Sequence, residues 1–173
     1  MSMATTIPAS LVMELRARTG AGVMDCRRAL SEAGGDLDRA AALLRTWGVA
    51  KAEKKADRAA REGLVESYIH GGGRIGVLLE VNCETDFVAR TEDFRRLARE
   101  LAMQVAATEP RFVSRDEVPE EQRDNPDLVQ AILLEQAYIR DERRTVADLV
   151  TEAVAKVGEN IQVRRFARFK VGE

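Results

Sequence analysis

The chain has 173 residues, of which 45% are hydrophobic and 32% are charged, and its formal net charge is −2. This composition supports a globular protein with an apolar core, and the slightly acidic balance argues against bulk attraction to nucleic acid. The two cysteines, Cys26 and Cys83, form no CxxC pair and there is no second histidine, so no metal or other cofactor is expected. No apolar run approaches the ~20 residues that span a membrane, and residues 1–6 lack the features of a secretion signal, which together predict a cytoplasmic protein.

The first 48 residues predict three short helices. Apolar residues recur at every fourth position from residue 7, and this first helix is expected to end at Gly20. A second helix is expected over residues 23–33, and a third from the N-cap Asp36 to Gly48. Three short helices indicate a compact bundle (residues 1–48), a kind of unit that more often binds a partner than carries chemistry.

Residues 49–62 predict a solvated linker helix. Five basic side chains lie along one side of this segment, with acidic residues between them: Lys51, Lys54, Lys55, Arg58 and Arg61. Phosphate binding is an alternative interpretation, but the interspersed acids dilute the positive field and favour a helix stabilised by charge pairs.

Residues 63–173 predict an α+β core. Two strands, residues 64–70 and 75–83, flank a glycine-rich turn and form a β-hairpin. The second strand alternates apolar residues at 77, 79, 81 and 83 with polar ones, which is typical of a half-buried strand.

The rest of the core predicts helices and one more strand. A strongly periodic helix with Phe94 on its apolar face follows residue 91, a loop spans residues 114–126, and an apolar-rich helix is expected over 128–139. Thr145 is expected to cap a further helix that Gly158 ends. A last strand (residues 161–171), with Phe169 on its apolar inner face and a basic outer face of Arg164, Arg168 and Lys170, completes a three-stranded antiparallel sheet packed with helices.

Asp86 and Phe87 stand at a corner between the second strand and the next helix. Residue type alone favours a phenylalanine packed into the core and an aspartate that caps the next turn. Corners on rigid scaffolds are also where binding groups tend to be displayed. Physical reasoning from these residues leaves both alternatives open.

The sequence contains no convincing catalytic arrangement. Ser67 and His70 lack an orienting acid, so they make no triad. Strand alternation places Glu80, Glu84 and Asp86 on one face, where they could bind a divalent cation. The solvent-exposed face of an edge strand explains these acids more simply. The chain is therefore expected not to be an enzyme.

Two long motifs are residues 11–26, LVMELRARTGAGVMDC, and residues 81–88, VNCETDFV. They resemble the two signatures of the elongation factor Ts family, the nucleotide exchange factors of bacterial and organellar translation. Residues 157–161, VGENI, and the segment RRF at 164–166 extend this similarity over nearly the whole chain, in order.

The resemblance implies a ubiquitin-associated-like bundle that docks on the GTPase domain of elongation factor Tu. The residues whose positions match that contact are Arg16, Val23 and Met24. The resemblance also implies that the corner presses on elongation factor Tu beside its magnesium and phosphate site, so that GDP leaves. The residues at that contact would be Thr85, Asp86, Phe87 and Val88.

The chain resembles the short form of the family, which implies a homodimer. Residues 116–144 are shorter than expected even for a short form, and the hairpin tip around His70 and Arg74 is a candidate for a second contact with elongation factor Tu. The partner would be bound in its GDP-bound and nucleotide-free states, with no membrane or direct nucleic-acid contact.

Two other classes remain as alternatives. An RNA-binding module would use the basic residues of 51–61 and the last strand, and would show steeply salt-dependent binding. A metal-dependent hydrolase would use Glu80, Glu84 and Asp86 and would contain bound metal.

Overall fold

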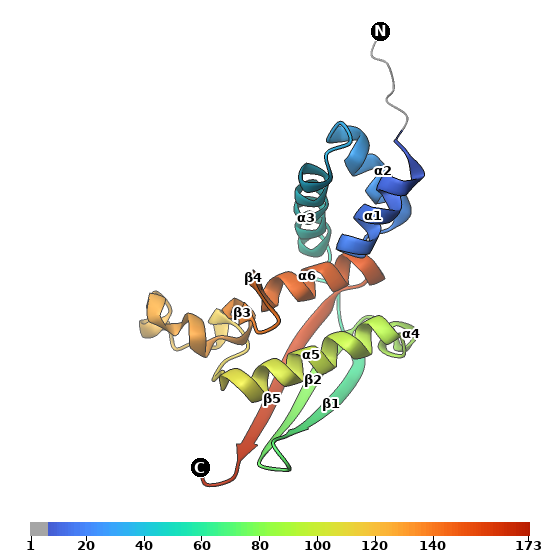
Figure 1. Cartoon of the computed structure of the whole chain (residues 1–173). Helices are drawn as coiled ribbons and strands as arrows, with labels where there is room; N and C mark the ends of the chain where they lie inside the picture. The colour runs from blue at the N-terminus through green and yellow to red at the C-terminus, as the bar shows by residue number, and fades with distance from the viewer. Residues whose placement is uncertain (1–6) are drawn as a thin grey trace.

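The fold has two parts, a helical bundle and a three-stranded sheet that helices cover on one face (Figure 1). The computed structural model describes residues 7–173, so the prediction about a secretion signal at residues 1–6 lies outside the described part. Among the residues described, no helix is long and apolar enough to cross a membrane. The predicted α+β class is confirmed.

The bundle consists of α1 (Ala9–Thr19), α2 (Val23–Glu32) and α3 (Leu37–Glu53). Its core is apolar and includes Val12, Leu15, Cys26, Leu30 and Ala40. The side chain of Asp36 accepts a hydrogen bond from the Arg39 amide at 2.8 Å, which confirms the predicted N-cap of α3.

The third helix does not end at Gly48, as predicted, but continues to Glu53. Gly48 lies inside the helix and is buried, and a Cβ built there would be 3.7 Å from the Cβ of Ala155 in α6 (Val146–Val157). The glycine therefore lies at a contact between two helices, where a Cβ would meet Ala155 at ordinary van der Waals distance, and it is no stop signal. Helix-forming residues follow it, and Lys51 fixes this last turn with a 2.7 Å ion pair to Asp25 of α2.

The predicted linker helix over 49–62 is wrong beyond the end of α3. Residues 54–61 form turns and extended chain instead. The side-chain amide of Asn160 donates hydrogen bonds to the carbonyls of Ala56 at 3.1 Å and Arg58 at 2.8 Å. The segment leaves the helical path because these carbonyls bond to the core and not to the next helical turn.

The sheet consists of β1 (Glu62–His70), β2 (Ile75–Cys83) and β5 (Ile161–Lys170) in the order β1-β2-β5, with both pairs antiparallel. This confirms the predicted hairpin and the predicted pairing of the last strand.

The inner face of the sheet lies against α5 (Glu92–Thr108), while α6 completes the core on the same side. The four apolar residues of β2 are buried as predicted: Val77, Leu79, Val81 and Cys83. Thr145 and Asp148 form a reciprocal capping box at the start of α6, which confirms the predicted cap.

A bulge interrupts the last strand. Glu80 of β2 lies opposite Arg165, whereas the next residue, Val81, lies opposite Val163. Arg164 is therefore the extra residue of the bulge. Because side chains alternate across a strand, every residue after the bulge faces the side opposite to the one that strict alternation predicts.

The predicted basic outer face of β5 is wrong for this reason. Arg168 turns to the helix side and donates to the carbonyl of Ala106 in α5 at 3.3 Å, and Lys170 follows it on the same side. Phe169, expected to be buried, lies on the outer face with 71% of its surface exposed.

The helix predicted over 128–139 is also wrong. Between α5 and α6 the chain forms four short 3-10 turns and a two-stranded sheet: η1 (Arg115–Glu117), η2 (Glu120–Gln122), η3 (Pro126–Ala131), η4 (Leu133–Glu135), β3 (Ala137–Tyr138) and β4 (Asp141–Thr145). We call this segment, residues 109–145, the excursion; it projects from one side of the core (Figure 1).

The apolar residues of the excursion are buried in two separate places. Leu128 and Ile132 belong to a small local cluster with Val118, whereas Leu133 packs into the main core. A single amphipathic helix cannot serve both sites, so the chain turns between them. The buried amide of Gln104 in α5 fastens the segment by donating to the Gln136 side chain at 3.0 Å.

Candidate partner-binding site

The corner after β2 carries an exposed phenylalanine. It is the one-turn helix α4 (Asp86–Ala89), and Phe87 has 78% of its surface exposed. The neighbouring Asp86 is half-buried and accepts a 2.7 Å hydrogen bond from Arg90. The interpretation that Phe87 packs into the core is therefore wrong, and the corner displays an aromatic ring beside a carboxylate.

The other two predicted corner residues, Thr85 and Val88, hold α4 in place on the core. The side chain of Thr85 is the N-cap of α4 and accepts from the Val88 amide. Val88 is half-buried and packs against the core, and Ala89 is buried. Thr85, not Asp86, is thus the capping residue, which leaves the Asp86 carboxylate at the surface.

The corner is also tied to the start of β5. One carboxylate oxygen of Glu159 accepts from the amides of Glu84 at 3.1 Å and Thr85 at 3.0 Å, and the other accepts from the Thr85 hydroxyl at 2.6 Å. Sequence reasoning did not single out Glu159, because its partners lie more than seventy residues away in the chain.

Beneath the corner lies the thiol of Cys83. Its sulfur donates to the carbonyl of Thr85 at 3.1 Å. Burial, reinforced by the negative charge of Glu159, raises the pKa of this thiol to about 11. The residue therefore behaves as a neutral, buried part of the corner's support.

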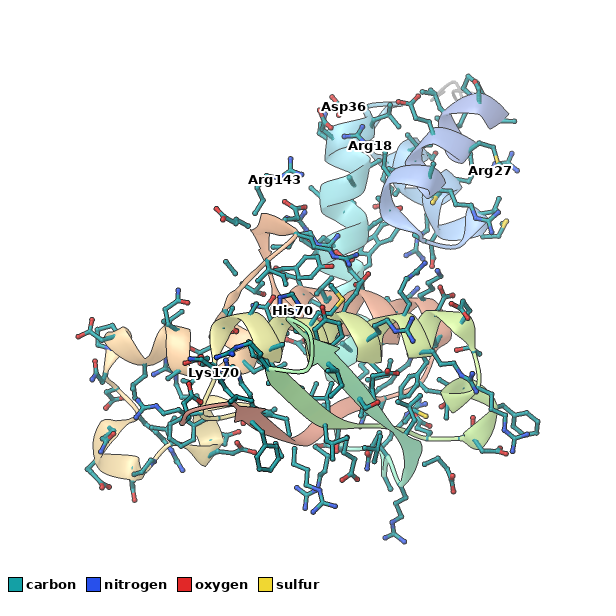
Figure 2. All side chains as sticks on the ribbon, turned by 60° about the horizontal axis from the view of Figure 1, so that its bottom comes forward. Arg18, Arg27, Asp36, His70, Arg143 and Lys170 are labelled. Atoms are coloured by element: carbon teal, nitrogen blue, oxygen red, sulfur yellow. The ribbon has the colours of Figure 1, made fainter. Side chains whose placement is uncertain are left out.

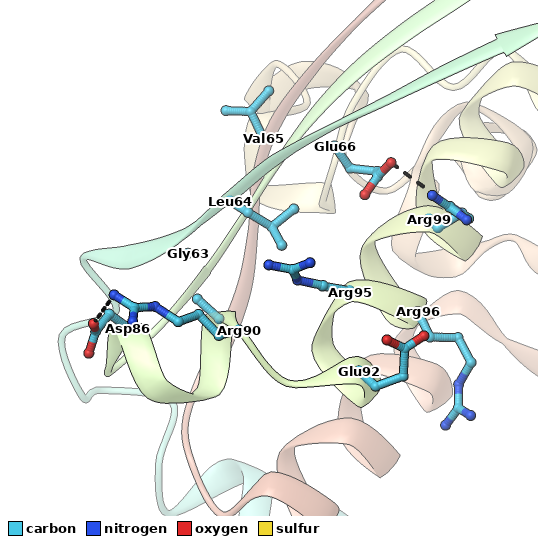
Figure 3. A pocket seen from close by; sticks show the side chains of 11 residues that line it. Gly63, Leu64, Val65, Glu66, Asp86, Arg90, Glu92, Arg95, Arg96 and Arg99 are labelled. Carbon is cyan, nitrogen blue, oxygen red and sulfur yellow. Dashed lines mark hydrogen bonds and ion pairs between the residues drawn. The ribbon is translucent and has the colours of Figure 1, made fainter.

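A groove of about 660 Å³ runs beside the corner, between β1 and the helices α4 and α5 (Figure 3). Its charged lining consists of Arg90, Arg95, Arg96, Arg99, Glu66, Asp86 and Glu92. Arg90 pairs with Asp86 at 2.7 Å and Arg99 with Glu66 at 4.0 Å, so much of the positive charge is compensated within the groove. Because Asp86 lines it, the groove is continuous with the corner.

The bundle presents a second apolar surface. Arg16 is exposed near the end of α1, and Val23 and Met24 begin α2, where Met24 has 75% of its surface exposed. Met13, three residues before Arg16 on the same face of α1, is exposed as well. Met13 was not identified from the sequence. Its position outside the apolar face of α1 could have indicated that this methionine is exposed.

The hairpin tip holds His70 (Figure 2) and Arg74, and both residues are exposed. The Tyr68 ring stacks on the His70 ring with 5.8 Å between the centroids. Gly71, Gly72 and Gly73 all have positive φ angles, between 62° and 90°, which explains the three consecutive glycines. The tip lies at the end of the sheet opposite to α4 (Figure 1).

The three acids of the hydrolase alternative each have another partner. Glu80 binds Arg165 at 2.7 Å on the outer face of the sheet, and Glu84 accepts from the Asn160 amide at 2.7 Å. Within residues 7–173, no group of three histidine, cysteine or acidic residues is placed to hold a metal. The RNA-binding alternative requires a basic outer face on the last strand, and Arg168 is not available for it because its side chain points toward α5.

Comparison with known proteins gives a consistent family. The family model described as Elongation factor TS matches residues 49–137. Proteins named Elongation factor Ts from Syntrophomonas wolfei, Anaeromyxobacter dehalogenans and Caldanaerobacter subterraneus are each 51% identical over 195 residues, covering 96% of this chain and 91%, 89% and 98% of theirs. Because the alignments are longer than this chain of 173 residues, the relatives contain residues that it lacks.

Proposed function

The chain belongs to the elongation factor Ts family, and from this premise we propose that this translation elongation factor is a guanine nucleotide exchange factor for elongation factor Tu. In this proposal it binds the GDP-bound GTPase, disturbs the magnesium and phosphate site through Asp86 and Phe87, and stabilises the nucleotide-free state. The activity belongs in the cytoplasm, where translation elongation takes place.

The exposure of Phe87 is the observation that carries the proposal. A phenylalanine with 78% of its surface exposed, on a capped helix that projects from the end of a sheet, is suited to insertion into a partner. Burying such a ring in a partner supplies about 1.5–3 kcal/mol. A thousandfold loss of nucleotide affinity requires about 4 kcal/mol of coupling, so further contacts have to contribute.

The bundle supplies the second part of the contact. Met13, Val23 and Met24 together offer an apolar surface, and Arg16 a charge, to the GTPase domain. Methionine side chains adapt to irregular partner surfaces, which suits a contact that persists while the partner changes state. The hairpin tip with His70 and Arg74 is the proposed third contact.

The proposed activity includes no covalent step. The same coupling that weakens GDP binding makes GDP weaken the binding of this chain to elongation factor Tu, because coupling between two ligands is reciprocal. A factor of this kind is released by nucleotide and acts repeatedly.

The test is the release of a fluorescent GDP analogue from elongation factor Tu by the parent and by Phe87→Ala. The parent is expected to accelerate release strongly, and Phe87→Ala to lose at least about tenfold of this effect, the equivalent of about 1.4 kcal/mol. Ile139→Ala, an apolar truncation on the exposed part of the excursion, is the matched control and should behave as the parent. No acceleration by a folded parent would exclude exchange activity.

A homodimer through the outer face of the sheet is part of the same proposal. This face is uncovered and carries exposed apolar side chains: Val65, Ile69, Leu78 and Phe169. Contiguous apolar surface of this kind marks interaction sites, and two identical sheet faces are self-complementary around a two-fold axis. Glu80 and Arg165 form an ion pair on the same face.

Sedimentation equilibrium tests the dimer. The parent is expected to sediment as a dimer, and Phe169→Glu as a monomer of unchanged fold, because it places a charge among the exposed apolar side chains of this face. Phe87→Ala should stay dimeric, since α4 lies at the end of the sheet and not on this face (Figure 1). A monomeric parent at micromolar concentration would refute the dimer without touching the exchange activity.

A further inference from the structure

The junction between α6 and β5 lies directly behind the corner. Its residue Glu159 uses both carboxylate oxygens to accept three hydrogen bonds, from the amides of Glu84 and Thr85 and from the Thr85 hydroxyl, at 2.6–3.1 Å. Hydrogen bonds to an ionised carboxylate are stronger than those between neutral groups. All three donors belong to the two residues that immediately precede α4.

The connection runs in both directions. The carboxylate of Glu84, at the end of β2, accepts from the amide of Asn160, just before the start of β5, at 2.7 Å. Each of two adjacent chain segments thus sends an acidic side chain to the backbone of the other. We call Glu84, Glu159 and Asn160 the brace.

The brace also holds the segment that leads to the bundle. Asn160 is 4% exposed, and its side-chain amide donates to the carbonyls of Ala56 and Arg58. Arg58 in addition lies 3.5 Å from the carboxylate of Glu84. One cluster therefore fixes both the corner and the chain that connects the bundle to the core.

The corner requires external support of this kind. A helix of four residues is far below the length that is stable in isolation, because nucleating a helical turn costs more than its few hydrogen bonds return. Phe87 contributes little to holding α4 in place, since most of its ring lies in solvent. A mobile corner would have to be ordered on binding, at a cost in affinity.

We propose that Glu159 is a positioning residue for nucleotide exchange, which holds Asp86 and Phe87 in the geometry that engages the partner. This inference deepens the proposed function and rests on it. The brace itself exists in the free protein, so its presence and its effect on exchange are separately measurable.

Amide hydrogen exchange on the free full-length chain tests the brace without a partner. In Glu159→Ala the amides of Glu84 and Thr85 should exchange at least about tenfold faster, whereas the amides that pair β1 with β2 keep their protection. Asp148→Ala is the matched control, because its carboxylate likewise accepts from a backbone amide, that of Thr145 at 2.8 Å, but at the far end of α6. Unchanged protection of Glu84 and Thr85 in Glu159→Ala would overturn the inference.

A double-mutant cycle in the GDP-release assay tests the positioning role. Glu159→Ala alone is expected to reduce the accelerated release about tenfold, but to add less than about twofold in a Phe87→Ala background, because both changes remove the same contact. Asp148→Ala should lower the melting temperature without this effect on release. Effects of Glu159→Ala and Phe87→Ala that simply multiply would show that Glu159 acts elsewhere and would overturn the inference.

The two tests separate the possible failures. A parent that does not accelerate GDP release refutes the proposed function, and the positioning role with it, while the hydrogen-exchange result still decides whether the brace orders the corner. If the parent accelerates release but the double-mutant cycle shows no coupling between positions 159 and 87, the proposed function stands and only the positioning role is refuted.

Discussion

The two ends of the β1–β2 hairpin differ in how firmly they hold their exposed side chains. At one end, Phe87 stands on the capped helix α4. The two residues before this helix, Glu84 and Thr85, donate three hydrogen bonds to Glu159, and the Thr85 hydroxyl accepts a fourth from the Val88 amide. At the other end, about 26 Å away by the ~3.3 Å rise per strand residue, His70 and Arg74 flank three glycines with left-handed backbone.

This difference suggests different tasks. A side chain that has to displace groups of a partner loses its effect if its own support yields, so it belongs on the braced end. A contact that only adds affinity tolerates an adaptable loop. We therefore expect changes at the corner to affect the exchange rate most, and changes at the tip to affect mainly affinity.

The largest effect on stability is expected for Phe94→Ala, which removes a fully buried ring from the main core. Phe94 is fully buried in the main core, whereas Phe87, seven residues earlier, is exposed. Truncation of a buried phenylalanine costs about 3–5 kcal/mol of unfolding free energy. Urea unfolding should show this loss for Phe94→Ala and a change within about 0.5 kcal/mol for Phe87→Ala. Equal losses for both would mean that Phe87 packs in the core in solution.

A smaller effect is expected for Thr85→Ala, which removes the cap of α4 and one donor to Glu159. Loss of an N-cap costs about 1 kcal/mol, so the change in unfolding free energy should be modest. Release of GDP from elongation factor Tu should nevertheless fall about tenfold, because the corner loses its orientation. Thr85→Ser keeps the hydroxyl and should restore both properties; a serine variant as impaired as the alanine variant would contradict the role of the hydroxyl.

The hairpin tip should give the smallest change in exchange. Replacing both His70 and Arg74 by alanine is expected to leave the unfolding free energy within about 0.5 kcal/mol, since both side chains are exposed. Exposed polar contacts contribute about 0.2–1 kcal/mol each, so the half-saturating concentration in the GDP-release assay should rise only a few fold at an unchanged maximal rate. A loss as large as that of Phe87→Ala would place the tip on a level with the corner.

The sequence predicted most of the sheet and its supporting helices because their signals are local. Alternation along β2, the cap at Thr145 and the glycines of the tip each act over a few residues. The bulge at Arg164 could not be foreseen, because inserting one unpaired residue changes which face Arg168 and Phe169 occupy without changing the composition of the strand. The excursion was missed for a similar reason, since its apolar residues serve two separate clusters.

The candidate site was predicted only in part. Residue type cannot distinguish Phe87 from Phe94; the helical periodicity around Phe94 predicted its burial, whereas the exposure of Phe87 was implied only by the resemblance to a family. The brace was not predicted, because the hydrogen bonds between Glu159 and Thr85 join positions 74 apart in the chain. Contacts of this kind depend on the register of β5 against β2, which a single sequence does not specify.

The thiol of Cys83 offers a direct readout of how firmly the corner is held. Burial and the charge of Glu159 raise its pKa from 9.0 to about 11, so only about 10⁻⁴ of it is ionised at pH 7. In a Cys26→Ser background, alkylation by iodoacetamide should be far slower than that of free cysteine and should rise about tenfold per pH unit up to about pH 11. Glu159→Ala removes one cause of the raised pKa and loosens the cover over the sulfur, so labelling at neutral pH should accelerate at least about tenfold. Labelling of the parent as fast as free cysteine would show that the corner opens readily on its own, and the contrast between a braced and an adaptable end of the hairpin would fail.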